Sequence, residues 1–144
     1  MRATFDAPTD PNAYRFCHQV RVRFAETDAM GVVHHAAYLP YLESARVEYL
    51  RSVGHPYVEL RRSGIELPVV EVVTRYLQPL VFDDLVDVHV VVAGVRAATV
   101  ELGYYLAVDG APKATAVTVH AVVAVGSGRP VRSPRWLHEL ATGS

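Results

Sequence analysis

The sequence has little of what would hold a chain together by covalent or metal chemistry. Its single cysteine, Cys17, excludes an internal disulfide and suits a reducing compartment. The adjacent histidines His34 and His35 lack the spacing of metal ligands on one helix face, and no further ligand motif accompanies them. We therefore expect no disulfide, no metal site and no cofactor.

An excess of charge of one sign is also missing. The chain carries 14 Lys and Arg residues against 15 Asp and Glu residues, a formal net charge of −1 at pH 7. This balance gives no overall attraction to nucleic acid or to an anionic membrane. Neither is expected as a partner, and an anionic ligand would need a local cationic patch.

Long apolar runs are absent as well. The most Val-rich segment is interrupted by Asp87 and His89, so no stretch approaches the ~20 residues of a membrane span. The first 14 residues lack the apolar stretch of a signal peptide. The sequence therefore predicts a cytoplasmic protein, with a flexible N-terminal arm at 1–14 and a single domain at 15–144. At 144 residues, 51% of them hydrophobic, the chain can bury one proper core.

Apolar spacing indicates where strands and helices lie. Strict alternation over 18–24 predicts a half-buried strand with Val20, Val22 and Phe24 on one face. From Tyr38 the apolar residues recur every three or four positions, which predicts a helix that ends before Gly54. The remaining segments are expected to form a helical turn at 57–63, strands at 66–77, 86–95, 99–108 and 114–125, and a last short helix around Trp136.

Short connections predict that neighbouring strands are antiparallel, as at the Asp-Gly hairpin signal at 109–110. One strand, one long helix and four strands define an α+β domain with a five-stranded antiparallel sheet. One helix cannot cover both faces of such a sheet. Val70 and Val72 alternate with Val69 and Val73, so both faces of that strand are apolar and self-association is expected.

One loop carries the candidate chemistry. Asp28 precedes Gly31 and the start of the long helix, where free backbone N–H groups and the helix dipole favour an oxyanion. A thioester needs little more, because a thiol of pKa ~8.5 is a good leaving group. The carboxylate could activate water or attack directly, and the residues do not separate these routes. By spacing alone, a turn or a helix cap is the more frequent explanation of such an Asp.

A longer motif extends from this loop along the chain. It comprises Thr27-Asp28, Gly31-Val32-Val33, His35, Tyr38, Glu43-Ser-Ala-Arg46, Leu67-Pro68-Val69, Tyr76-Leu-Gln-Pro79 and Arg129-Pro-Val-Arg132-Ser-Pro134. This set resembles the signature of the 4-hydroxybenzoyl-CoA thioesterase branch of the hotdog superfamily, in particular the acyl-CoA thioesterases associated with the Tol–Pal gene cluster. The resemblance covers nearly the whole chain after Tyr14.

The resemblance implies a hotdog fold, in which the five-stranded antiparallel sheet wraps around one long central helix. It implies hydrolysis of an acyl-CoA thioester, with Asp28 as the essential acid and with carbonyl-polarising amides near Gly31, Val32 and Val33. It also implies a homodimer, often paired into a homotetramer, whose active sites lie at the subunit boundary.

Several further residues are candidates with two interpretations each. His35 could orient the substrate or Asp28, or could be an ordinary packed residue. Glu43 could assist catalysis, or could pair with Arg46 one helical turn away. Arg129 and Arg132 could hold the phosphates of coenzyme A, or could be solvated surface charges. The expected walls of an acyl pocket are Met30, Tyr38 and Leu42, which favour an apolar group of modest size.

Three other functions remain open at this level. One is hydrolysis of acyl groups from an acyl carrier protein, which would release a polyketide or fatty acid product. Another is a hotdog dehydratase or hydratase, which needs a paired acid and base such as His35 with Asp28, although the local pattern does not resemble the dehydratase motif. The third is a non-catalytic acyl-CoA-binding module, against which Asp28 argues.

Overall fold

The Val-rich part of the chain forms an antiparallel sheet in the computed structural model, which describes residues 2–143. Five strands lie in the order β1-β4-β5-β6-β3, and every neighbouring pair is antiparallel. This confirms the predicted five-stranded sheet and the α+β class. The strands are β1 Phe16–Arg21, β3 Val69–Tyr76, β4 Leu85–Val95, β5 Thr99–Val108 and β6 Ala111–Ala121, and a small second sheet joins β2 Ile65–Glu66 to β7 Val123–Ala124.

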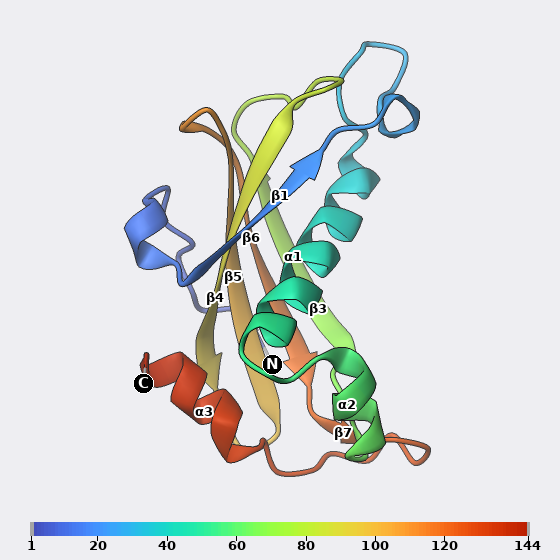
Figure 1. Cartoon of the computed structure of the whole chain (residues 1–144), viewed down its shortest axis with the longest axis vertical. Coiled ribbons are helices and arrows are strands. Elements are labelled where there is room, and N and C mark those ends of the chain that lie inside the picture. Colours follow the sequence, from blue (N-terminus) through green and yellow to red (C-terminus); the bar gives the residue numbers. More distant parts are fainter. Residues whose placement is uncertain (1, 144) are drawn as a thin grey trace.

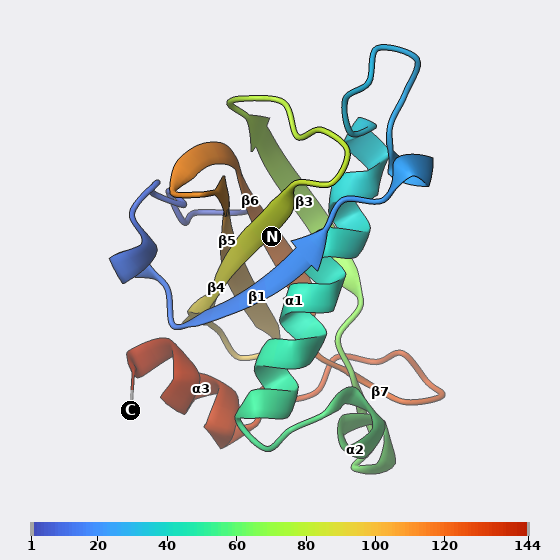
Figure 2. The same ribbon diagram turned by 45° about the horizontal axis from the view of Figure 1, so that its top comes forward.

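The long helix α1, Tyr38–Ser52, lies across one face of this sheet (Figure 2). Its predicted apolar stripe faces the sheet: Tyr38, Leu42, Ala45 and Tyr49 are all buried. The helix packs mainly against β1 and β4, so part of the face beside β3 stays uncovered. Two shorter helices, α2 Tyr57–Arg62 and α3 Arg135–Thr142, lie at the opposite end of the sheet from the loop that enters α1 (Figure 1).

The first strand ends earlier than its alternation predicts. After Val22 the chain leaves the sheet and forms a 3₁₀ turn, Phe24–Glu26, which the Glu26 carboxylate closes by accepting the amide N–H of Arg23 at 2.9 Å. Phe24 was expected on the buried face with Val20 and Val22. It is instead 75% exposed and lies edge-on to Phe82. The expectation was wrong because a local hydrogen bond ended the strand before its apolar alternation did.

The segment predicted as one strand at 66–77 is divided. The chain breaks at Leu67-Pro68, which separates β2 from β3, and a β-bulge lies between Val69 and Glu71. A bulge adds one residue to a strand and reverses the alternation beyond it. Val69 and Val72 therefore both line the groove beside α1, contrary to the simple alternation expected for this segment.

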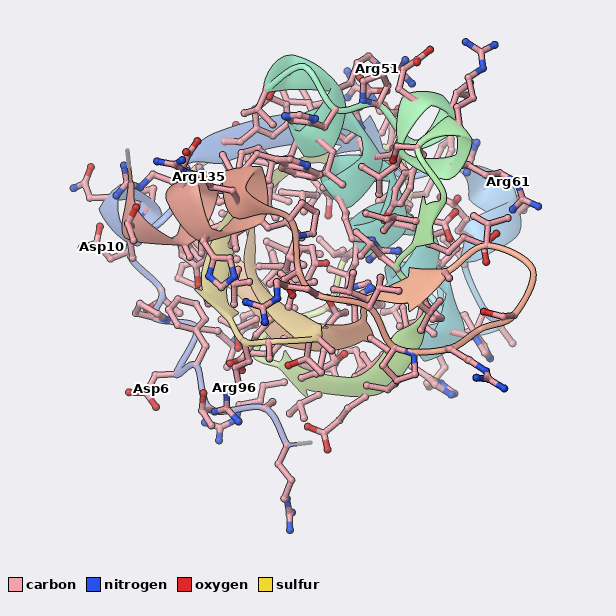
Figure 3. The ribbon with its side chains drawn as sticks, turned by 90° about the horizontal axis from the view of Figure 1, so that it is seen from below. Asp6, Asp10, Arg51, Arg61, Arg96 and Arg135 are labelled. Carbon is pink, nitrogen blue, oxygen red and sulfur yellow. The ribbon has the colours of Figure 1, made fainter. Side chains whose placement is uncertain are left out.

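The N-terminal segment lies against the face of the sheet that is turned away from α1 (Figure 3). Tyr14 is buried there, and Phe5 is partly buried against the same cluster. The flexibility expected of residues 1–14 stays a prediction. Among residues 2–143, no helix has the length and apolar character needed to cross a membrane.

Candidate active site

Backbone hydrogen bonds shape the loop that carries Asp28. The amide of Gly31 donates to the carbonyl of Asp28 at 3.0 Å, which closes a tight turn, and the amide of Asp28 donates to the carbonyl of Val32 at 2.8 Å. Gly31 has a φ of 81°, a conformation that a residue with a side chain rarely adopts. The glycine therefore allows the turn that presents the carboxylate at the entry to α1.

The two carboxylate oxygens of Asp28 have different surroundings. Oδ1 accepts the amide N–H of Met30 at 2.8 Å, and the amide of Val32 lies 3.4 Å away. Within residues 2–143, Oδ2 has no hydrogen-bond donor. The turn interpretation thus holds for one oxygen, and the other is left for a ligand or a water molecule.

A pocket of about 370 Å³ opens beside this carboxylate. The ring of Tyr76, from the end of β3, meets the ring of Tyr38 edge-on with centroids 4.9 Å apart. The pocket is therefore apolar on most sides, with Asp28 as a charged group in its wall. Its lining residues are Asp28, Val32, Val33, His35, Tyr38, Tyr76, Leu77, Gln78 and Pro79.

The backbone amides near Asp28 are not equally free. The amide of Gly31 is bound within the turn, and that of Val33 donates to the carbonyl of Leu80 at 2.8 Å. In the described part of the chain, the amide of His35 donates to no protein acceptor. His35 begins the 3₁₀ turn His35–Ala37 that leads into α1, and unbonded N–H groups are typical of such helix starts. Among the residues that line the pocket, the amide most available for a carbonyl oxygen is thus that of His35, two residues beyond the predicted group.

A second carboxylate, Glu26, holds this loop in place. It accepts the hydroxyl of Tyr41 at 2.6 Å and the guanidinium of Arg23 at 2.6 Å, and its backbone carbonyl accepts the amide of His34 at 2.8 Å. Burial raises the pKa of Glu26, but the hydrogen bonds from Arg23 and Tyr41 outweigh it, so the pKa lies below its ordinary value. Burial and Glu26 together raise the pKa of Tyr41. This support was not expected from the sequence.

Some predicted site residues lie outside the Asp28 pocket. Met30 is 82% exposed on the turn, whereas Leu42 is buried in the core. Glu43 is exposed and lines a separate groove of about 310 Å³ between α1 and β3, together with Leu42, Val69 and Val72. Met30 and Leu42 are therefore not walls of the Asp28 pocket within one chain.

The two candidate phosphate-binding arginines also lie away from Asp28. Arg129 and Arg132 are exposed in the segment between β7 and α3. Figure 1 shows this segment beside α2, at the opposite end of the sheet from the loop that enters α1. A single chain does not bring these arginines to the pocket.

A buried polar cluster lies farther along α1. Arg46 donates to the hydroxyls of Tyr57 and Tyr104, at 3.0 and 3.2 Å. Tyr104 bonds Thr118 at 2.7 Å, and Thr118 bonds Nε2 of His120 at 2.9 Å. Arg46 was expected to pair with a helix carboxylate, yet in the part of the chain that the structure describes no carboxylate pairs with it.

The hydrogen-bond directions in this cluster are determined by its two ends. Arg46 can only donate, and the Leu67 carbonyl, 2.9 Å from Nδ1 of His120, can only accept. A neutral His120 with its proton on Nδ1 satisfies every member in one consistent direction. Burial and the positive charge of Arg46 lower the pKa of His120 to about 4.

No group of three or more His, Cys, Asp or Glu side chains among residues 2–143 is arranged to hold a metal ion. The Asp28 pocket offers one carboxylate oxygen, one backbone donor and apolar walls. That set can polarise a carbonyl and direct a base or a nucleophile at its carbon.

A five-stranded antiparallel sheet with one long helix against it, and a carboxylate in a pocket at the helix entry, defines a protein of the hotdog class. The chain belongs to the thioesterase-like superfamily, whose sequence model matches residues 22–140. It is 36% identical over 125 residues to a protein of Aquifex aeolicus named as an esterase, covering 87% of this chain and 96% of that one.

Two further comparisons agree with this assignment. The Haemophilus influenzae protein named acyl-CoA thioesterase YbgC is 33% identical over 121 residues, covering 83% of this chain and 89% of its own. A crystal structure of a hypothetical protein from Aquifex aeolicus superposes with a TM-score of 0.82 at 35% identity, over 88% of this chain and 99% of the other. Thioester hydrolysis is thus the activity that the family relationship supports.

Proposed function

We propose that the protein hydrolyses an acyl-CoA thioester to the free acid and coenzyme A, with Asp28 as the essential carboxylate. The observation that carries the proposal is the unequal bonding of its two oxygens. Oδ1 is fixed by the amide of Met30, which sets the orientation of the side chain, and Oδ2 remains available in a pocket. A carboxylate used only to build the turn would not need a pocket beside it.

The amide of His35 supplies the second element. A thioester carbonyl bound in the pocket accepts this N–H, and the helix start behind it favours negative charge on the oxygen. In one route, Oδ2 of Asp28 removes a proton from a water molecule while that water attacks the carbonyl carbon. In the other route, Oδ2 attacks the carbonyl carbon itself. In both routes the C–S bond breaks and the thiolate leaves without a strong general acid. Direct attack leaves the acyl group on Asp28 as a mixed anhydride, which water then hydrolyses to the free acid and the regenerated carboxylate.

The acyl group then lies against the apolar walls of the pocket. Val32, Val33, Tyr38 and Leu77 surround a volume of about 370 Å³. This space suits an apolar group of modest size, such as a benzoyl-like or a short aliphatic group, better than a long fatty chain. On these grounds we propose that the chain belongs to the 4-hydroxybenzoyl-CoA thioesterase branch of the family, near its Tol–Pal-associated members. A cytoplasmic location stays a prediction.

A homodimer would connect the pocket with the candidate arginines. The edge strand β3 exposes Val69, Val70, Val72 and Val73, an apolar edge that invites pairing with a second copy. Antiparallel pairing of two β3 strands about a two-fold axis places the Val69 end of one beside the Tyr76 end of the other. The segment with Arg129 then approaches the partner's pocket, where it can meet the phosphates of coenzyme A. Equilibrium sedimentation that shows a monomer at micromolar concentration would contradict this assembly.

A free-thiol assay over a panel of acyl-CoA thioesters tests the proposed reaction. We expect thiol release that is linear in enzyme concentration and absent from a chain with Asp28→Asn. If thiol is released from acyl carrier protein thioesters but not from acyl-CoA thioesters, the substrate is the carrier-protein thioester instead. Loss or gain of water on a β-hydroxyacyl or enoyl thioester without thiol release would identify a dehydratase or hydratase. Binding without any turnover would leave a non-catalytic acyl-CoA module.

A further inference from the structure

The outer face of the sheet, turned away from α1, is apolar and yet buried within a single chain. Its strands β4, β5 and β6 point side chains outward, away from the main core. Five of these side chains are between 0% and 8% exposed, and they are Val91, Tyr105, Ala107, Val117 and Val119. In a one-helix fold such a face would be open, so something other than α1 covers it.

The cover is the chain's own N-terminal strap, which we define as residues 3–14. Tyr14 packs on Tyr105 with ring centroids 6.0 Å apart, and Phe5 meets Tyr14 edge-on at 6.1 Å. The hydroxyl of Tyr14 donates to the carbonyl of Pro8 at 2.8 Å, which folds the strap back on itself. Figure 3 shows Asp6 and Asp10 of the strap on the side of the sheet opposite α1.

Gly103 provides the seat for Phe5. A Cβ atom at position 103 would overlap the ring of Phe5. Gly103 has no unusual backbone conformation, so the strand itself does not require a glycine there. The missing side chain therefore serves the approach of the strap.

Glu101 anchors the strap by polar bonds. Glu101 is only 4% exposed. Its carboxylate accepts the amide of Thr4 at 2.6 Å, the hydroxyl of Thr4 at 2.9 Å and the amide of Phe5 at 2.9 Å. A second sheet stacked on this face would present side chains rather than backbone N–H groups. Glu101 would then be buried without donors, which is strongly unfavourable.

The strap also lies outside the part of the chain that matches the family, which begins at residue 22. We infer that the strap is a built-in cover that reserves the outer face for the chain's own N-terminus and keeps a second copy of the chain from stacking there. A homotetramer assembled through this face is thereby excluded.

The test compares two chains that both carry Glu101→Leu, which removes the charge that disfavours stacking. One is full length and the other lacks residues 2–9. We expect the full-length variant to keep the sedimentation mass of the unaltered protein, because Phe5 and Tyr14 still cover the face. The shortened variant should double that mass. Equal masses for the two variants would overturn the inference, as would a doubled mass for the full-length variant.

A second pair of variants does not depend on the shortened chain folding. In the full-length Glu101→Leu background, Gly103→Ala should displace Phe5 and double the mass, with unchanged circular dichroism. Gly94→Ala is the matched control, because an added Cβ there meets nothing within 4 Å. If both alanine variants keep the original mass, the outer face has no tendency to bind a copy and the inference fails. The readout is mass, so it is independent of the role proposed for Asp28.

Discussion

Two polar clusters lie along α1, and they differ in whether their polar atoms are already bonded. At the entry to the helix, Asp28 uses one oxygen on the amide of Met30 and leaves the other beside a pocket. Two turns farther along, a buried chain of hydrogen bonds runs from Arg46 through Tyr104, Thr118 and His120 to the carbonyl of Leu67. The first cluster has a polar atom available for a ligand, whereas the polar atoms of the second are already hydrogen-bonded to one another.

The difference separates function from stability. Polar groups that satisfy one another inside the fold are costly to disturb but have nothing left for a substrate. A polar group with one unused atom at a pocket contributes less to stability and can act on a ligand. Changes in the Asp28 cluster should therefore alter the rate, and changes in the Arg46 cluster should alter the free energy of unfolding.

The largest expected effect is that of Asp28→Asn. The amide oxygen can still accept the N–H of Met30, so the turn should survive, while the base or nucleophile is lost. We expect kcat to fall at least ~100-fold, measured by thiol release, with a melting temperature close to that of the unaltered protein.

Asp109→Asn is the matched control for this change. Asp109 lies in the hairpin turn between β5 and β6 with a φ of 48°, a conformation that Asn also tolerates. This variant should keep full activity. If Asp28→Asn keeps more than about a tenth of the activity, far above the loss expected for a removed base, Asp28 is not the essential acid.

The second effect is a pH dependence of stability at His120. Its pKa is about 4 in the folded protein and 6.5 ordinarily, so between these values the unfolded chain binds a proton that the folded chain does not. Stability is therefore fully present above pH 6.5 and falls as the pH is lowered toward 4, by about 3 kcal/mol from this group. Denaturant unfolding at a series of pH values measures the slope.

His120→Gln should flatten this slope, whatever its effect on stability at pH 7. Carboxylates also titrate in this range. The quantity to compare is therefore the difference between the two proteins in the slope of unfolding free energy against pH. Identical slopes would mean that His120 binds protons equally in the folded and unfolded states, so that the fold does not lower its pKa. Thiol release at pH 7 should change little in the variant, because the cluster does not line the Asp28 pocket.

A smaller effect concerns the length of the acyl chain. Each added methylene that is buried should stabilise the bound transition state by ~0.8 kcal/mol, which raises kcat/KM about fourfold. This gain should stop once the pocket is full. We expect a maximum among short, medium or aromatic groups across acetyl- to palmitoyl-CoA, with benzoyl- and phenylacetyl-CoA included. A steady increase to palmitoyl would show that the pocket continues into a tunnel, such as the groove beside Glu43.

The smallest expected effect is that of the exposed arginines. If Arg129 or Arg132 holds a phosphate of coenzyme A, its replacement by Ala should raise KM several-fold with little change in kcat. The difference should shrink as salt is added, because the contact is solvent-exposed. An unchanged KM for both variants at low salt would make these residues ordinary surface charges.

Much of the architecture followed from local patterns. The spacing of Tyr38, Leu42, Ala45 and Tyr49 predicted the buried face of α1, because helix period and burial agree there. The turn signal at 109–110 marked the β5–β6 hairpin. Asp28 was chosen from the motif around it, and a pocket opens beside it, but its catalytic role stays a prediction. These features depend on residues close together in the chain.

Other features depended on contacts between distant segments. Whether an amide near Asp28 is free is decided by the carbonyl of Leu80, 47 positions after Val33, and not by the order of residues in the loop. Arg46 resembled a surface salt-bridge residue until the fold placed Tyr57 and Tyr104 around it. Local spacing indicates which residues share a face, but only the packed chain determines which polar atoms are already bonded and which remain free to act.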